Sequence, residues 1–252
     1  MKLVVLLFSI AALLLCGSAQ AGKIVVNNDE WTLSNTGFTQ AGAANAGGFA
    51  TNVAAFFTGG GTGNFLAYSS NFGLSESSLA SAMTGAGHTW TVDNSGTFDV
   101  ATLLGFDGIF VGGAPYPDNS VLIDYVNAGG NVYVMAGTGN GGSAAEAAAW
   151  NTFLMAFGLE YVGTSYNGIA GNQAITSGHP IFSGVAQLYQ NNGNTIIDTN
   201  LADTRGVVFE NGLYAVFDSS GASPVPEPAS LVLLGLGLGG LGFARRRLRR
   251  LR

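Results

Sequence analysis

Residue types that can do chemistry are scarce in this chain of 252 residues, which has two histidines and a single cysteine. The cysteine, Cys16, lies in a stretch typical of a signal peptide, with Lys2 at its start, apolar residues 3–16, and the small-x-small cleavage site Ala19-Gln20-Ala21. A lipoprotein signal at Cys16 is disfavoured by the bulky Leu15 before it. Cleavage after Ala21 leaves a mature protein with no thiol, which excludes disulfides, thiolate metal ligands and a cysteine nucleophile.

The carboxylates most able to bind a ligand are Asp29 and Glu30, which stand beside Trp31 just after the apolar residues 24–26. Together they could chelate calcium or bind a sugar, with Trp31 as a stacking platform. The alternative is a solvated turn that opens a loop. The chain has no metal-ligand spacing and no phosphate-binding Gly-Lys motif, so we expect no bound metal and no cofactor.

Short apolar runs alternate with helical patterns along the chain, which predicts an α/β fold with a largely parallel sheet. The predicted strands are residues 23–28, 65–68, 89–92, 109–111, 131–135, 195–197, 207–209 and 213–217. Four helices are predicted. One covers residues 49–57, two begin after the N-caps Ser75 and Asn119, and the fourth covers residues 143–157. The low-complexity stretches 41–48 and 59–63 predict loops.

Residues 106–142 carry a more specific pattern. One strand ends in Gly112-Gly113, a helix ends in Ala128-Gly129-Gly130, and the next strand leads into the turn Gly137-Thr138-Gly139-Asn140-Gly141. This order resembles the centre of class I glutamine amidotransferase-like domains, which are flavodoxin-like three-layer sandwiches. The resemblance implies a single domain of this kind over residues 22–220.

The turn at 137–141 departs from that family at the position that carries catalysis. Catalytic members place a cysteine in a Gly-x-Cys-x-Gly elbow beside a helix N-terminus, and here Gly139 stands at the cysteine's position. Thr138 is one residue away, but a threonine needs an adjacent base to become a nucleophile. His88 and His179 do not stand in the family's Cys-His-Glu arrangement. The resemblance with this departure predicts an elbow without catalytic residues.

Open α/β sheets bind ligands at the carboxyl ends of their strands, so we expect a ligand crevice there. By the predicted strands it is lined by Asp29, Glu30, Trp31, Gly113, Thr138, Asn140 and His179, with Glu146 as a further candidate. The polar, aromatic stretches 166–168 and 189–194 suit carbohydrate contacts and plain surface turns equally well.

The predicted domain is strongly acidic. Lys23 and Arg205 are its only basic side chains against fourteen carboxylates, a net charge of about −12. This balance excludes binding to nucleic acid or to an anionic lipid surface by charge.

The last 27 residues contain three distinct pieces in a fixed order. The bend Pro226-Glu227-Pro228 is followed by the apolar run 229–244 and by residues 245–252, which include six arginines. The arginines keep the end of the chain in the cytoplasm, and the apolar run is shorter than the roughly 20 residues of a stable span. The order resembles the PEP-CTERM sorting signal of Gram-negative bacteria. The alternative is an ordinary single-pass anchor.

The sorting resemblance implies signal peptidase and an exosortase as partners. It also implies an intermediate tethered to the inner membrane by its C-terminal helix, followed by delivery to the cell surface or the extracellular matrix. The predicted organisation is a signal peptide (1–21), the domain (22–220), a linker with the motif (221–228), a transmembrane helix (229–244) and a basic cytoplasmic tail (245–252).

Three functions remain open for the domain. The leading hypothesis is a non-catalytic surface or matrix protein that binds polysaccharide or a partner. The second is a divergent hydrolase that uses Asp29, Glu30 or Thr138. The third alternative is a purely structural surface protein without a ligand.

Overall fold

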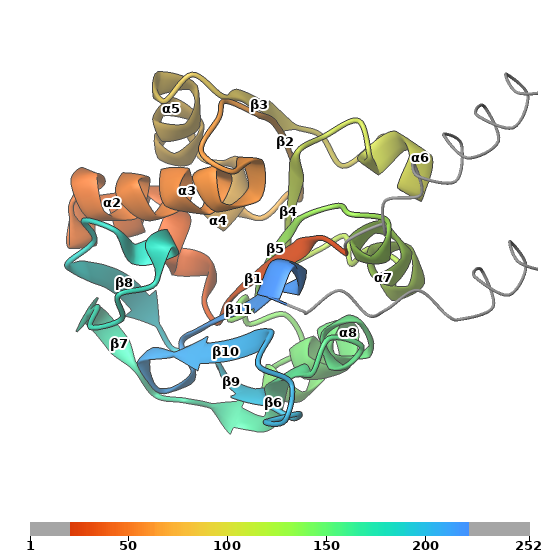
Figure 1. The fold of residues 1–252 in the computed structure, drawn as a ribbon. Helices are drawn as coiled ribbons and strands as arrows, with labels where there is room; N and C mark the ends of the chain where they lie inside the picture. Colours follow the sequence, from red (N-terminus) through yellow and green to blue (C-terminus); the bar gives the residue numbers. More distant parts are fainter. Residues whose placement is uncertain (1–20, 222–252) are drawn as a thin grey trace, which may run out of the picture. The chain divides into compact units, whose positions relative to one another are not determined.

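A sheet of seven strands organises the computed structural model, which describes residues 21–221 (Figure 1). The strand order is β10-β11-β1-β5-β4-β2-β3. The strands are β1 (Lys23–Asn27), β2 (Asn64–Tyr68), β3 (Thr89–Val92), β4 (Gly108–Gly112), β5 (Val132–Met135), β10 (Gly206–Phe209) and β11 (Tyr214–Asp218). Strands β1 to β5 pair in parallel with one another, whereas β11 is antiparallel to both β1 and β10. The predicted α/β fold with a mostly parallel sheet is confirmed.

Several predicted segments lie outside the described residues. These are the signal peptide up to residue 20, the motif at 226–228, the transmembrane helix at 229–244 and the basic tail at 245–252. Within residues 21–221, no helix combines the length and the apolar character needed to cross a bilayer.

Helices cover both faces of the sheet (Figure 1). One face carries α2 (Asn35–Ala41), α3 (Ala43–Thr58), the short α4 (Phe72–Ser75) and α5 (Ser77–Gly85), and the other carries α6 (Val100–Leu103), α7 (Asn119–Asn127) and α8 (Ser143–Met155). Four short 3-10 helices complete the described chain: η1 (Glu30–Leu33), η2 (Pro180–Phe182), η3 (Glu210–Gly212) and η4 (Ser219–Gly221).

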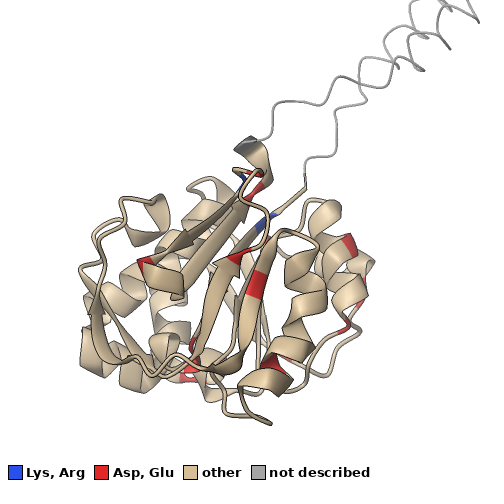
Figure 2. Ribbon diagram, turned by 90° about the horizontal axis from the view of Figure 1, so that it is seen from below, with Lys and Arg blue, Asp and Glu red and all other residues tan. Residues whose placement is uncertain are grey.

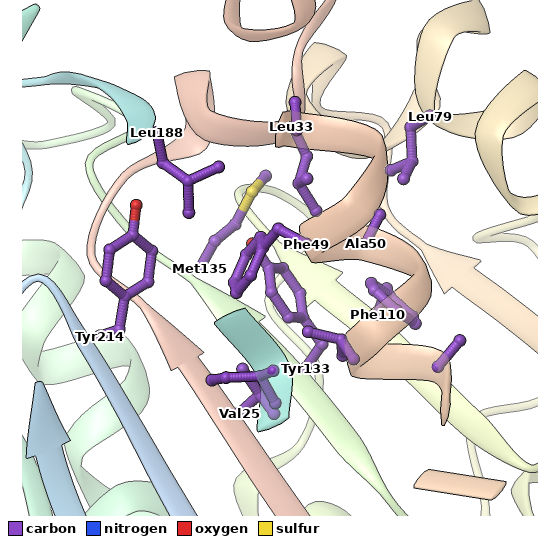
Figure 3. Close-up of a cluster of buried hydrophobic side chains, with 14 of the residues drawn as sticks. Val25, Leu33, Phe49, Ala50, Leu79, Phe110, Tyr133, Met135, Leu188 and Tyr214 are labelled. Atoms are coloured by element: carbon purple, nitrogen blue, oxygen red, sulfur yellow. The ribbon is translucent and has the colours of Figure 1, made fainter. Parts of the chain in front are cut away.

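Successive side chains of each central strand point into two apolar cores, one on each face of the sheet. In β1, Ile24 and Val26 pack into the core under α7 and α8, whereas Val25 packs into the core under α3. All three are fully buried, as expected of a strand whose sheet is covered on both sides. Figure 3 shows Phe49 of α3 over the sheet, where its ring centroid lies 5.4 Å from that of Tyr214.

Two small sheets extend the chain beyond α8. Strand β6 (Leu159–Tyr166) pairs with β9 (Asn194–Asp198), and β7 (Ala170–Ala174) pairs with β8 (Gln187–Asn191). The strand predicted at 195–197 therefore belongs to a separate sheet and does not close the central one. The stretches 166–168 and 189–194 combine strand ends with turns, because residues 167–168 and 192–193 lie between strands while 166, 189–191 and 194 belong to them.

The prediction of a loop at 41–48 is wrong, because only Gly42, with φ of 89°, separates α2 from α3. The small residues at the start of α3 allow close packing, and a Cβ at Gly47 would already touch Phe38 and Ala82. The loop predicted at 59–63 is confirmed.

Two predicted helix caps are also wrong, each by one residue. The helix predicted to begin at Asn119 is capped by Asp118, whose carboxylate accepts from the Ser120 N–H at 2.8 Å. Ser75 ends α4, and α5 follows after Glu76. Sequence patterns locate a helix more securely than its first residue, because several neighbouring polar side chains can serve as the cap.

Candidate functional site

The loops that follow the parallel strands meet at one edge of the sheet. The neighbouring strands β1 and β5 send the chain to opposite faces, since β1 is followed by α2 and α3 and β5 by α8. Ligand sites of open α/β sheets form where adjacent strands diverge in this way. Residues 28–30 after β1 and 137–141 after β5 therefore stand at the position where a ligand site is expected.

Glu146 holds the elbow that follows β5. It lies in the first turn of α8 and its side chain is fully buried. One carboxylate oxygen accepts from the Gly137 N–H at 2.8 Å, and the other accepts from the Asn140 N–H at 3.3 Å and from the Thr138 hydroxyl. The backbone donors of the elbow are thus already occupied by a carboxylate of the same chain.

The glycines of the elbow serve different purposes. Gly137 has φ of 70°, and a Cβ there would lie 2.8 Å from the Asn28 carbonyl oxygen and 3.0 Å from the Gly193 Cα, so the position excludes any side chain. Gly139 has φ of 71°, but a Cβ there would meet nothing within 4 Å. Position 139 is therefore open and left-handed, and it carries no side chain.

Asp29 and Glu30 are buried at the end of β1, with exposed fractions of 0% and 5%. Asp29 accepts from the Trp31 N–H at 2.7 Å and from the Asn191 N–H at 2.5 Å, and Glu30 accepts from the Asn71 side-chain amide at 2.5 Å. Burial raises the pKa of Asp29 to about 7 against the opposing effect of its two backbone hydrogen bonds. Burial also raises the pKa of Glu30 to about 7.

Two tyrosines complete the cluster that Asp29, Glu30, Thr138, Asn140 and Glu146 form at this edge of the sheet. The Tyr116 hydroxyl lies beside Thr138 and Asn140, and the Tyr166 hydroxyl lies beside Glu146. Burial, with a further contribution from Glu146, raises the pKa of Tyr166 to about 12. Neither hydroxyl completes a hydrogen bond of normal geometry within residues 21–221.

Unpartnered amide groups accompany these hydroxyls. Asn28 is fully buried, and both polar atoms of its side chain lack a partner in the described part of the chain. The same holds for the side-chain oxygen of Asn194, whose nitrogen donates to the Ser143 carbonyl at 3.0 Å. Buried polar atoms of this kind are normally satisfied by ordered water or a ligand.

The turn between β8 and β9 closes over the end of β1. Asn191 bonds Asp29, and Gly193 packs so closely on Asn28 that a Cβ would lie 1.8 Å from its carbonyl oxygen. No local pattern links this stretch with Asp29, because the contact joins residues about 160 positions apart. The sequence pattern also placed Asn28 and Tyr116 at the strand ends, but it did not mark Asn71, which bonds Glu30 from the loop after β2.

The structure brings most of the predicted crevice residues together at this edge. Gly113 is buried with φ of 63°, and a Cβ there would lie 3.0 Å from the Asn71 side chain. Asn140 is exposed, and Trp31 is half-buried with its ring edge-on to Phe72 at 4.9 Å. Trp31 therefore offers only part of its ring as a stacking platform.

The two histidines lie apart from the cluster. His179 packs between the rings of Phe56 and Phe209, at centroid distances of 5.5 and 5.1 Å. It caps η2 by accepting from the Ile181 N–H, so its assignment to the crevice is not supported by its contacts. His88 stands at the predicted turn from helix to strand, against Phe65. Burial lowers the pKa of both imidazoles.

The charges of the domain are distributed unevenly (Figure 2). Lys23 begins β1, and the carbonyl of Arg205 accepts from Asp218, the register partner of Lys23, so both basic residues lie at the edge opposite the cluster. Across residues 21–221 no three His, Cys, Asp or Glu side chains are grouped so that they could hold a metal ion. The cluster carboxylates accept hydrogen bonds from neutral donors, and, besides burial, the charges of Glu30 and Glu146 help to raise the pKa of Asp29.

Comparison with known proteins identifies one feature. Residues 224–250 match the family model described as the PEP-CTERM protein-sorting motif, at the place where the sequence predicts that signal. The match supports export, sorting by an exosortase, and a surface or extracellular location. Comparisons with the curated proteins and with the solved structures gave no match.

Proposed function

We propose that the protein is an exported cell-surface or matrix protein whose domain, residues 22–220, is a non-catalytic relative of the amidotransferase-like fold. The observation that carries this proposal is the occupied elbow. Glu146 accepts from the Asn140 N–H, the donor after the nucleophile position that a substrate oxyanion needs in an acyl-transfer enzyme, and Gly139 supplies no nucleophile. The cluster around the elbow then serves binding.

The chemistry of the cluster favours a neutral, hydroxyl-rich ligand such as a polysaccharide. Among its carboxylates, Glu30 accepts one hydrogen bond and can accept another from a sugar hydroxyl, and the tyrosines and asparagines of the cluster have donors and acceptors without partners. An anionic ligand is disfavoured, because Glu30 and Glu146 lie there and both basic side chains of the described residues lie at the other edge. Trp31 adds an apolar surface at the border.

Binding of neutral glycans tests this proposal. Maltopentaose and cellopentaose are the neutral probes, and an oligogalacturonate of the same length is the anionic control, all measured by titration calorimetry on the exported protein. We expect a neutral probe to bind and Tyr166→Phe to weaken it about tenfold, since the substitution removes one hydroxyl without a partner in the described chain. Tyr68→Phe, whose ring packs on Phe98, is the matched control.

Failure of both neutral probes to bind, or tighter binding of the oligogalacturonate, contradicts this ligand class. Equal effects of Tyr166→Phe and Tyr68→Phe would place binding elsewhere on the domain.

One observation favours a second candidate, a divergent hydrolase. The Thr138 hydroxyl donates to the Glu146 carboxylate, and a nucleophile bonded to a base is the pattern of covalent catalysis. The pair is isolated, however, because His88 packs on Phe65 and His179 packs between Phe56 and Phe209.

Variants at Thr138 separate the two candidates. We expect no hydrolysis of the neutral probes or of p-nitrophenyl esters above that of Thr138→Ala, because Glu146 already accepts two backbone hydrogen bonds that hold the elbow. Product release is measured by chromatography and absorbance. Turnover that Thr138→Ser retains and Thr138→Ala abolishes would establish the hydrolase.

A further inference from the structure

Gly22, the residue after the predicted cleavage site, is buried at the start of β1. Its N–H donates to the Val126 carbonyl at 2.6 Å, and the Lys23 N–H donates to the Asn131 side chain at 2.9 Å. A Cβ at position 22 would lie 1.7 Å from the Gly130 carbonyl oxygen, so only glycine fits. The first mature residue is therefore part of the packed fold.

Ala21, on the other side of the scissile bond, is held as well. The Ser219 hydroxyl donates to its carbonyl oxygen, and Ala21 lines a cavity of about 290 Å³ together with Phe157 and Phe217. A protease needs an accessible, extended segment, and folding withdraws both residues that flank this bond. Cleavage must therefore precede the docking of β1.

The acceptor at position 126 lies at a helix end that lacks a positive charge of its own. Val126 is in the last turn of α7, its carbonyl also accepts from the Gly129 N–H at 3.0 Å, and this turn contains no basic side chain. The carbonyl end of a helix carries partial negative charge and favours a cation. Signal-peptide removal converts the Gly22 amide into an ammonium group at this place.

We infer that the α-ammonium group of mature Gly22 binds the C-terminal carbonyls of α7 and fastens β1 in the sheet. The charged donor strengthens the bond that the amide makes to Val126. Because β1 lies between β11 and β5, this contact secures the strand that joins the antiparallel and parallel parts of the sheet. The inference rests on the predicted cleavage site and is independent of any glycan binding.

Amine labelling of the exported full-length chain tests the inference. The protein is produced in a host with signal peptidase, purified in detergent, and treated with an acetylating reagent in native buffer and in guanidinium chloride. Mass spectrometry gives the N-terminal residue and its degree of labelling. We expect Gly22 at the N-terminus and labelling at least about tenfold slower in the native protein, because the amine reacts only during local opening.

A variant with Gly-Ser-Gly inserted between Ala21 and Gly22 is the control, since its new amine extends beyond the end of α7 and should react in native buffer as it does in denaturant. Equal rates for the wild-type amine in both conditions would overturn the inference. A mature chain that begins at a residue other than Gly22 would overturn it too.

Discussion

Glu146→Gln is expected to lower the free energy of unfolding by about 2 to 4 kcal/mol. The substitution keeps the size of the side chain but turns one acceptor oxygen into an NH₂ donor. That donor then faces either the Gly137 N–H or the Asn140 N–H and the Thr138 hydroxyl, so at least one buried donor loses its partner. Guanidinium unfolding of the exported protein, followed by tryptophan fluorescence, gives the difference.

Glu160→Gln is the matched control for this prediction. Glu160 lies in β6 and is half-buried, and the same change there should alter stability by no more than about 0.5 kcal/mol. If the two variants unfold at the same denaturant concentration, the Glu146 carboxylate does not hold the elbow and the non-catalytic interpretation loses its main support.

Glu30→Gln is expected to raise the free energy of unfolding at pH 8 by about 1 to 2 kcal/mol and to leave it nearly unchanged at pH 4. Burial raises the pKa of Glu30 from 4.5 to about 7 in the folded protein. Between these values the folded state holds a proton that the unfolded state has lost. The contribution of Glu30 to stability therefore falls as the pH rises through this window, and it is least favourable above pH 7.

Glutamine escapes this cost because it stays neutral and still accepts from the Asn71 amide. Urea unfolding of both proteins at pH 4, 6 and 8 measures the effect. Asp29 titrates in the same window and its pKa is raised in part by the charge of Glu30, so the difference between the two proteins reports Glu30 together with its repulsion of Asp29. A difference in the free energy of unfolding that stays constant from pH 4 to pH 8 would show that the pKa of Glu30 is not raised.

A carboxyl that weakens the fold at neutral pH points to function, since proteins retain such strain where a site needs it. In the proposed binding site, Glu30→Gln should therefore gain stability while it weakens binding of the neutral glycan. An inert structural domain would show the gain in stability alone.

Local patterns were sufficient for the framework of the fold. Residues 109–111 and 131–135 form strands because a parallel strand covered on both faces reads as a continuous apolar run. The turn at 137–141 lies between β5 and α8 as the glycine spacing predicts. The sorting motif was likewise visible in the order of its three pieces, since such signals are linear in sequence.

The small sheets could not be read from the sequence. Strand β7 alternates between exposed and half-buried residues and contains Gly171, Asn172 and Gln173, so it lacks the apolar run that marks a strand. Its position depends on pairing with β8, which in turn packs Leu188 into the core beneath α3. Such pairing depends on tertiary contacts that no local sequence pattern shows.

The sequence by itself determined where the strands of the parallel sheet lie, which residue stands at the elbow, and that the domain is acidic. Only the tertiary structure decided that Glu146 closes the elbow, that Asn191 bonds Asp29, and that Asn28 is buried without a partner. The reason is physical: an apolar period is a property of neighbouring residues, whereas the burial and pairing of a polar group depend on segments that fold onto it from elsewhere.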